Sequence, residues 1–225
     1  MSLIQRYRTI KDKLPDSVTL IAVSKTKPAS DIQELYGEGH RDFGENKVQE
    51  LTTKAEELPK DIRWHMIGHL QRNKVKYIAP FVHLIHGVDS PRLLKEINKR
   101  AKNAERTIDC LLQVHIAEEE SKFGFDKEAL LEFIESEAFQ SYEHIRIRGL
   151  MGMATLTDDG EIIKREFRSL KALFEELQSA LSGSTHQIDT LSMGMTNDYQ
   201  LAVEEGSTMV RIGSAIFGER DYSSQ

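Results

Sequence analysis

The sequence of 225 residues has one cysteine, five prolines and no long apolar run. The lone Cys110 excludes an intramolecular disulfide and a metal site built from cysteines. No apolar stretch approaches the roughly 20 residues that a membrane helix needs. The first residues, MSLIQRYRTIKDKL, carry charges every few positions in place of the apolar core of a signal peptide. We therefore expect a cytoplasmic protein with no membrane partner.

A long run of basic residues is also missing. The 30 Lys and Arg residues are outnumbered by 36 Asp and Glu residues, which leaves a net charge of −6. Nucleic acids and anionic membranes bind cationic surfaces, so neither is expected as a partner. Hydrophobic residues make up 39% of the chain and charged residues 29%, which is typical of a soluble globular protein with a substantial core.

Short β-rich runs alternate with helical patterns along the whole chain. The expected strands are 18–25, 41–46, 63–68, 83–88, 108–116, 145–152, 187–194 and 208–218. The expected helices are 29–38, 47–57, 71–79, 90–105, 126–138, 161–181 and 197–205. The clearest is 161–181, where the apolar residues Ile163, Phe167, Leu170, Phe174, Leu177 and Leu181 step by four and three.

This alternation predicts a parallel sheet with right-handed crossovers. Eight strand–helix units in about 220 residues favour a closed (β/α)8 barrel of the TIM type, with residues 1–225 as a single domain. The alternative is an open doubly wound sheet. Such a sheet normally has a glycine-rich turn after its first strand, and that turn reads KTKPAS here.

The stretch LIAVSKTKP (20–28) ends a buried strand on an amine. In these barrels chemistry collects where strands end. Because strand side chains alternate in direction, Ile21, Val23 and Lys25 share a face that would fill the interior and open into the mouth. An amine partly desolvated there, near another cation, could form a Schiff base with a carbonyl. The alternative is that Lys25 pairs with a carboxylate at the rim.

The turns after the seventh and eighth strands, LSMGMTND and RIGSAIFGER, combine glycines with hydroxyl groups. Phosphate sites in such barrels commonly follow these two strands. In the first turn Ser192 and Thr196 offer hydroxyls, and Gly194 allows a close backbone approach. The helix expected after Thr196 offers free N–H groups, as do Gly213 and Ser214 in the second turn. The alternative is ordinary turn and cap chemistry.

Arg211 lies two residues before Gly213, on the same face of the eighth strand. A Schiff-base amine and a phosphate site together match the aldehyde and the phosphate of pyridoxal 5'-phosphate. An arginine stays cationic, so facing the pyridine nitrogen it would keep that nitrogen unprotonated and weaken the ring as an electron sink. The alternative is a rim ion pair from Arg211 to Glu45 or Glu219.

Segments spread over essentially the whole chain resemble the pyridoxal phosphate homeostasis proteins, the single-domain relatives of the alanine racemase barrel. They are AVSKTKP (22–28), DFGENKVQE (42–50), WHMIGHLQRNK (64–74), ESKFGF (120–125), GLMGM (149–153), LSMGMTND (191–198) and GSTMVRIGSAIFGERDY (206–222). The resemblance implies a (β/α)8 fold and an internal aldimine on Lys25. It implies a phosphate site at Ser192, Gly194, Thr196, Gly213 and Ser214. It also places Arg211 by the pyridine nitrogen and Asn46 near the cofactor.

Three functions stay open. The first is a non-catalytic carrier or regulator of pyridoxal 5'-phosphate, which acts in vitamin B6 homeostasis and has apo-enzymes of that cofactor as partners. The second is a racemase-like enzyme that uses the same cofactor. The third is a phosphosugar enzyme whose Lys25 attacks the carbonyl of the substrate itself.

A racemase needs an acid or base on each face of the carbanion. In the racemases that the chain resembles, the second group is a tyrosine from a C-terminal β domain. Only seven residues follow Gly218 here, and the remaining candidates near the mouth are Tyr199 and Tyr222. We therefore favour a carrier without catalytic turnover, and we expect a monomer.

No metal site is predicted. His65 and His69 have HxxxH spacing, but the intervening MIG reads as a strand end, so the two rings would not share a helical face. Three other histidines are expected inside strands: His83, His86 and His115. Cys110 is expected in the core.

Overall fold

The structure is a computed structural model that describes residues 1–117 and 123–218. These residues form eight parallel strands that pair in chain order and close into a barrel, because β8 also pairs with β1. The strands are β1 Thr19–Val23, β2 Asp42–Glu45, β3 Arg63–Met66, β4 Leu84–Val88, β5 Ile108–Gln113, β6 Ile145–Met151, β7 Thr190–Ser192 and β8 Met209–Ile212. The predicted barrel is confirmed, and the open sheet is wrong.

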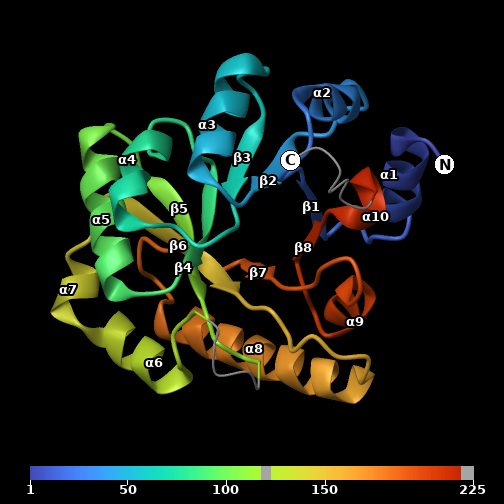
Figure 1. Ribbon diagram of the computed structural model, residues 1–225. Coiled ribbons are helices and arrows are strands. Elements are labelled where there is room, and N and C mark those ends of the chain that lie inside the picture. The colour runs from blue at the N-terminus through green and yellow to red at the C-terminus, as the bar shows by residue number, and fades with distance from the viewer. Residues whose placement is uncertain (118–122, 219–225) are drawn as a thin grey trace.

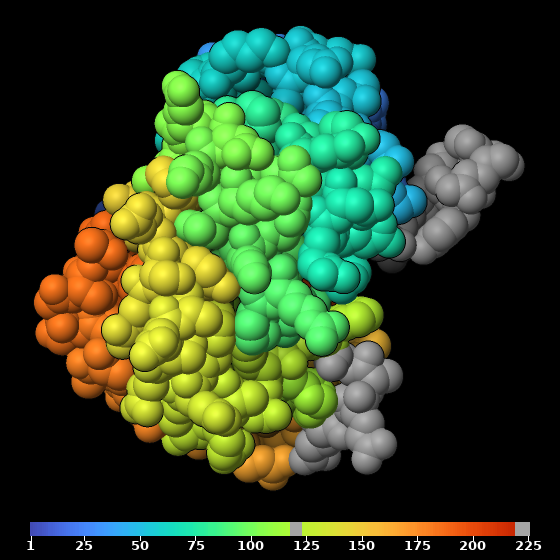
Figure 2. All heavy atoms as spheres, turned by 90° about the vertical axis from the view of Figure 1, so that its left-hand side faces the viewer, coloured from blue at the N-terminus to red at the C-terminus, as the bar shows by residue number. Residues whose placement is uncertain are grey.

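Helices surround the strands in Figure 1. They are α1 Leu3–Lys11, α2 Ala29–Gly37, α3 Val48–Glu57, the 3-10 turn η1 Arg72–Lys74, α4 Val75–Ile78, α5 Pro91–Asn103, α6 Lys127–Glu135, α7 Glu137–Gln140, α8 Gly160–Ala180, α9 Tyr199–Glu204 and α10 Ser214–Phe217. Figure 2 shows the side on which the segment from α4 to α7 covers the strands. Among the described residues, no helix is both long and apolar enough to cross a bilayer.

The strands separate two apolar layers, because successive side chains point to opposite faces. The inner layer is a small cluster of Ile21, Leu84, Leu111, Met151 and Met209. The outer layer lies between strands and helices and contains Leu20, Ala22 and Cys110 among many others. The predicted alternation in the first strand is therefore confirmed for Ile21, and Cys110 is a core residue as expected.

Helix α8 illustrates why these segments become helices. Its predicted apolar stripe is buried from Ile163 to Leu177, and each such side chain contributes about 1.5–3 kcal/mol on burial. The helix begins at Gly160 because the Asp159 carboxylate accepts hydrogen bonds from the N–H groups of Glu161 and Ile162.

Several predicted boundaries are wrong, and two of them illustrate the local reasons. The eighth strand was expected to run over 208–218, but it ends at Ile212, and the Gly213 carbonyl then accepts from the N–H groups of Ile216 and Phe217 to start α10. A short apolar run is ambiguous between strand and helix. The helix expected at 126–138 is divided at Ser136, whose hydroxyl accepts from the N–H of Phe139 and caps α7.

Helix α1 was not predicted. Its signal is a capping box, in which the Ser2 hydroxyl accepts from the Gln5 N–H and the Gln5 side chain accepts from the Ser2 N–H. The Arg6 Nε donates to the carbonyl of Ile216 at 2.7 Å, which ties α1 to α10. Because α10 follows β8 directly, α1 supports the last strand end of the barrel.

Candidate functional site

A cavity of about 540 Å³ lies at the carboxyl ends of the strands. Small-molecule sites usually measure about 300–1,000 Å³, so the volume suits such a ligand. Six of the eight predicted site residues line this cavity: Lys25, Asn46, Thr196, Arg211, Gly213 and Ser214. The other two, Ser192 and Gly194, lie behind its wall.

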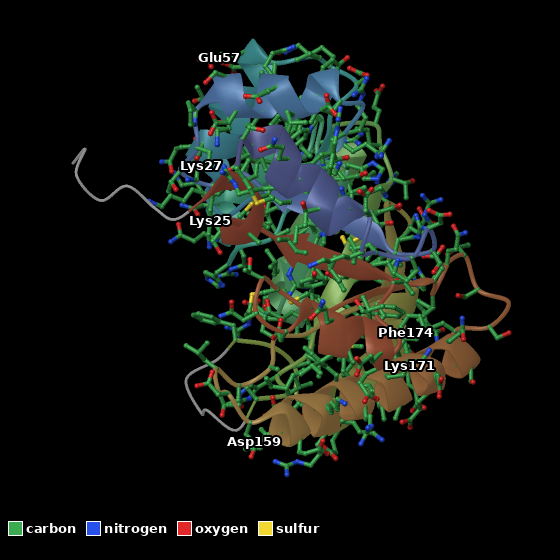
Figure 3. All side chains as sticks on the ribbon, turned by 90° about the vertical axis from the view of Figure 1, so that its right-hand side faces the viewer. Lys25, Lys27, Glu57, Asp159, Lys171 and Phe174 are labelled. Atoms are coloured by element: carbon green, nitrogen blue, oxygen red, sulfur yellow. The ribbon has the colours of Figure 1, made fainter. Side chains whose placement is uncertain are left out.

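Lys25 follows β1 in a turn, because the strand ends at Val23 and does not reach residue 25 as predicted. Val23 and Lys25 both line the cavity. Figure 3 shows Lys25 and Lys27 on the same side of the molecule as Asp159, where α8 begins. The amine therefore belongs to the mouth of the barrel, as the strand pattern indicated.

A charged cluster outside the barrel holds the backbone before Lys25. We call it the outer cluster, and it consists of Ser24, Glu45, Glu50 and Lys54. The Lys54 Nζ donates to the Ser24 carbonyl at 2.8 Å, to Glu45 Oε1 at 2.8 Å and to Glu50 Oε1 at 2.7 Å. The Ser24 hydroxyl also donates to Glu45 Oε1 at 2.6 Å. All three ammonium protons are thus used to join α3, β2 and the end of β1.

The same cluster holds the backbone after Lys25. The Thr26 N–H donates to Glu50 Oε1 at 2.6 Å. Thr26 has a φ of 63°, a left-handed conformation that costs a β-branched residue about 1–3 kcal/mol. Glu50 therefore helps to keep a strained turn in place, and with Lys54 it fixes the peptide on both sides of Lys25.

Glu45 is fully buried within this cluster. Burial raises the pKa of its carboxyl, and the opposing effects of Lys54 and Ser24 are smaller. Its Oε2 has no hydrogen-bond partner among the described residues. Removing Lys54 would leave this carboxylate without a counter-charge in the interior.

Arg211 points inward from β8 and is almost fully buried. Its Nη1 donates to the Ser192 carbonyl at 2.8 Å and to the Ser192 hydroxyl at 2.7 Å, and its Nη2 donates to the Gly152 carbonyl at 3.0 Å. Burial lowers the pKa of Arg211 to about 10, so it stays cationic at neutral pH. A rim ion pair to Glu45 is wrong, because Glu45 lies outside the barrel with Lys54; Glu219 lies outside the described residues.

Ser192 and Gly194 have structural reasons for their identity. The Ser192 hydroxyl is completely buried between Arg211 and His86 Nδ1, which lies 3.1 Å away. Gly194 has a φ of 97°, and a Cβ there would lie 2.6 Å from the Ala202 Cβ on α9. Ser192 therefore supports Arg211, and Gly194 lets α9 pack closely.

The turns after β7 and β8 meet at the cavity as predicted. The hydroxyls of Ser214 and Thr196 are 3.3 Å apart. Helix α9 begins at Tyr199, later than predicted, because Asp198 Oδ1 accepts from the Met195 N–H and closes a turn first. Thr196 consequently lies in this turn, at the cavity wall. At the start of α10 the Ser214 N–H has no acceptor within the helix, as at any helix start.

Of the two tyrosines considered as a second acid or base, Tyr199 does not line the cavity. It is buried in α9, and Tyr222 lies outside the described residues. Lys27 and Asp198 are further titratable groups at the cavity wall. Burial raises the pKa of the Asp198 carboxyl.

His86 of β4 was expected only as a strand residue, and His65 of β3 as a structural or cofactor-contacting histidine without a metal. His65 and His86 both point into the barrel, and His65 Nδ1 lies 3.0 Å from His86 Nε2. His69 is exposed, stacks on Phe123 and hydrogen-bonds Asp89. Within residues 1–117 and 123–218 no group of three or more His, Cys, Asp or Glu side chains could hold a metal ion. Strand alternation applied to both strands at once could have revealed the internal pair.

A larger groove of about 1210 Å³ runs between η1 and α5. Its lining residues include His69, Arg72, Asp89 and Arg92, and none of its lining residues is shared with the cavity at the strand ends. Neither Lys25 nor the hydroxyl pair reaches it. The smaller cavity is therefore the candidate site.

Comparison with known proteins identifies the family of the chain. The family model described as alanine racemase, N-terminal domain, matches residues 2–221. The chain is 41% identical to the pyridoxal phosphate homeostasis protein of Pasteurella multocida over 215 residues, which is 94% of this chain and 91% of that protein. It is 40% identical to the human protein of the same name, with 92% of this chain and 78% of that protein covered.

Similar solved structures include PipY and an alanine racemase. PipY of Synechococcus elongatus, solved with PLP bound, superposes with a TM-score of 0.88 at 35% identity and covers 96% of this chain and 100% of its own. An alanine racemase of Clostridium difficile shares the fold, with a TM-score of 0.74 at 17% identity over 98% of this chain and 57% of its own. The chain therefore belongs to the alanine racemase N-terminal-domain family, and within it to the pyridoxal phosphate homeostasis proteins.

Proposed function

We propose that this chain binds pyridoxal 5'-phosphate in the cavity at the strand ends and serves the homeostasis of that cofactor. One observation carries the proposal: an amine, a buried guanidinium and a pair of hydroxyls line a single cavity of about 540 Å³. Relatives that are about 40% identical are named for this role, and the neighbour PipY was solved with PLP bound.

The residues present fit the chemical groups of the cofactor. Lys25 would supply an amine to hold the aldehyde of the cofactor. The hydroxyls of Thr196 and Ser214, with the N–H groups around Gly213, are donors suited to a phosphate. Arg211 is a donor only and stays charged, so it suits an unprotonated ring nitrogen. When bound, the cofactor supplies an aldehyde that exchanges reversibly between amines.

The donors proposed for the phosphate are neutral. A hydroxyl or backbone N–H holds a phosphate less strongly than a bidentate arginine does. Arg211, the buried arginine of the site, is tied to Ser192 and Gly152. We infer a site that holds its cofactor and can also release it to an incoming amine, which suits a carrier that works without catalytic turnover.

The finer features follow from the same proposal. We infer a cytoplasmic monomer in which residues 1–225 form one barrel domain, with apo-enzymes of the cofactor as recipients. A racemase-like activity is the alternative, and it would need a second acid or base opposite Lys25. Tyr199 does not line the cavity, which leaves Asp198 and Lys27 as groups to test.

The decisive experiment is borohydride trapping followed by peptide mapping. We expect the chain mixed with pyridoxal 5'-phosphate to gain visible absorbance and, after reduction, to carry the label on Lys25. Lys27→Ala is the matched control, because Lys27 lines the same cavity two residues away. It should keep the label, and Lys25→Ala should lose it. A label on Lys27 would overturn the assignment.

Two further assays separate the alternatives. Robust racemisation of alanine or another amino acid would overturn the non-catalytic carrier. Trapping of sugar phosphates on Lys25 in place of the cofactor would favour the phosphosugar enzyme.

A further inference from the structure

An unbroken line of hydrogen bonds crosses the barrel interior, from the cavity to the opposite end. We call it the inner chain, and it consists of Arg211, Ser192, His86, His65 and Asp42. From Arg211 Nη1 to the Ser192 hydroxyl is 2.7 Å, and from there to His86 Nδ1 is 3.1 Å. From His86 Nε2 to His65 Nδ1 is 3.0 Å, and from His65 Nε2 to Asp42 Oδ1 is 3.1 Å.

All five side chains are buried, none of them more than 9% exposed. Buried polar groups are stable only when they are hydrogen-bonded, so each atom of the chain must find its partner within it. Strand alternation explains the arrangement. Asp42 shares a strand face with Gly44, two residues later, and Gly44 faces Ile21 of the inner layer. His86 shares a face with Leu84 of that layer, two residues earlier, so both side chains point into the barrel.

The positions of the protons follow from Asp42. Arg63 binds this carboxylate with both Nε and Nη2, so Asp42 is ionised and can only accept. His65 must therefore carry a proton on Nε2. A neutral His65 then accepts at Nδ1, which requires a proton on His86 Nε2.

The remaining links continue in the same direction. His86, with its proton on Nε2, accepts at Nδ1, so the Ser192 hydroxyl must donate to it. A lone pair of the Ser192 oxygen is then free to accept from Arg211. In every hydrogen bond of the inner chain, the donor is therefore the group nearer to Arg211 and the acceptor is the group nearer to Asp42.

The surroundings of His86 favour the neutral ring. Burial lowers the pKa of His86 well below its ordinary value, and the positive charge of Arg211 acts in the same sense. For Asp42 burial would raise the pKa, but the bonds from Arg63 and His65 hold it well below its usual range. A carboxylate at one end and neutral rings between are mutually consistent.

We propose that His86 and His65 are positioning residues for the cofactor site, acting as neutral rings with their protons on Nε2. They turn the Ser192 proton away from Arg211, so that the guanidinium donates to Ser192. Three of the five guanidinium N–H groups are then used within the described residues, and two remain for a ligand at the cavity wall. What Arg211 binds rests on the proposed function, whereas the order of the protons does not.

Nitrogen-15 NMR of the full chain without cofactor tests the proton order. At neutral pH we expect His65 and His86 both to show a protonated Nε2 and an unprotonated Nδ1. A doubly protonated His65, or a His86 with its proton on Nδ1, would overturn the proposal.

Ser192→Ala tests whether the order is transmitted. His86 Nδ1 would lose its donor, so the His86 proton can move from Nε2 to Nδ1. His65 must then take up one proton from solvent at its Nδ1 to donate to His86 Nε2, and it becomes doubly protonated. A purely structural role of Ser192 would not change His65, two links away. The matched control is Thr190→Val, which removes a hydroxyl from the same strand that bonds Asp189 instead. It should leave both rings unchanged, and an unchanged His65 in Ser192→Ala would contradict transmission.

Cofactor affinity tests the consequence for the site. We expect Ser192→Ala to weaken binding of pyridoxal 5'-phosphate about tenfold relative to Thr190→Val, which corresponds to about 1.4 kcal/mol. Equal affinity of the two variants would overturn the positioning role. If the wild-type chain failed to bind the cofactor at all, the proposed function would fall, and the NMR result alone would then support or overturn the order of the protons.

Discussion

The outer cluster and the inner chain are both buried polar groups beside the same cavity, yet they are built differently. The outer cluster packs formal charges together, with one ammonium against two carboxylates around Ser24 and Thr26. The inner chain keeps its charges at its two ends, Arg211 and Asp42, and links them through neutral groups. The first design holds a backbone in place, and the second gives a direction to hydrogen bonds.

Lowering the pH is also expected to change the stability contributions of the two regions in opposite directions. Burial raises the pKa of Glu45, so its contribution to stability is present below the ordinary value of 4.5 and is lost as pH rises through the raised pKa. Burial lowers the pKa of His86, so its contribution is present above 6.5 and is lost as pH falls. Charge type and burial together therefore decide which region fails first in acid.

The largest expected effect comes from breaking the outer cluster. Lys54→Ala should lower the free energy of unfolding by about 3–5 kcal/mol, because it leaves Glu45 as an uncompensated buried charge. Urea denaturation measures this change. Lys171→Ala is the matched control, since Lys171 forms a partly exposed pair with Glu175, and i,i+4 pairs of this kind on a helix are worth about 0.3–0.5 kcal/mol. A loss in Lys54→Ala no larger than in the control would refute the buried-pair account.

A double variant sharpens the same point. In Lys54→Met with Glu45→Gln the fully buried carboxylate is gone and only the part-buried Glu50 loses its partner, so we expect it to recover more than half of the stability lost in Lys54→Ala. It should still trap less cofactor on Lys25 than the wild-type chain does, because the Ser24 carbonyl has lost its donor. Full recovery of both stability and trapping would show that the cluster does not position Lys25.

Acid should weaken the inner chain first. Between pH 6.5 and 5 we expect the free energy of unfolding to fall, because the unfolded chain binds protons that buried histidines do not. Burial also lowers the pKa of His40 from 6.5 to about 4, which by itself contributes about 1.5 kcal/mol to the fall between pH 6.5 and 5. His86→Asn keeps this contribution, so its flatter pH profile, measured by urea denaturation at each pH, would isolate His86. A profile parallel to the wild type would argue against a neutral His86.

A neutral link should matter less to stability than a buried charge. Ser192→Ala removes one hydroxyl from the inner chain, and we expect a loss of about 1–3 kcal/mol in the free energy of unfolding. The same urea experiment gives the value. A loss equal to that of Lys54→Ala would remove the distinction between the two regions.

The smallest expected effect concerns the turn at Lys25. Thr26→Gly relieves the strain of the left-handed conformation at φ 63°, which stabilises the folded chain, but it also makes the unfolded chain more flexible. Because the two effects oppose each other, the free energy of unfolding should change by less than about 1 kcal/mol. Thermal unfolding measures this. Thr9→Gly, at an exposed position of α1, is the comparison and is expected to be destabilising. Destabilisation beyond that of Thr9→Gly would show that Thr26 has packing contacts more important than its strain.

Much of the fold could be predicted because its signals are local. The stripe of α8 and the strand that leads to Lys25 depend on spacing alone, and spacing decides which face is buried. Errors occurred where a short apolar run suits either state, as after Gly213, or where a cap was overlooked, as at Ser2. Neither error moved a residue away from the site.

The candidate site was predicted in part. Lys25, Thr196, Gly213 and Ser214 were placed correctly at the cavity, because strand ends of a barrel must converge. Ser192 was taken as a ligand because a hydroxyl looks the same whether it faces a cavity or the interior. Its partner His86 is 106 residues away in the sequence, and no local pattern joins the two.

Periodicity, turn residues and charge balance in the chain were enough to specify a (β/α)8 barrel with an amine at one strand end and hydroxyls at two others. Closure of the barrel decided which side chains meet. It brought His65 within hydrogen-bond distance of His86, Lys54 of Ser24 and Arg211 of Ser192. The physical reason is that spacing reports which face a side chain occupies, whereas hydrogen bonds across the interior depend on the register between strands that are distant in sequence.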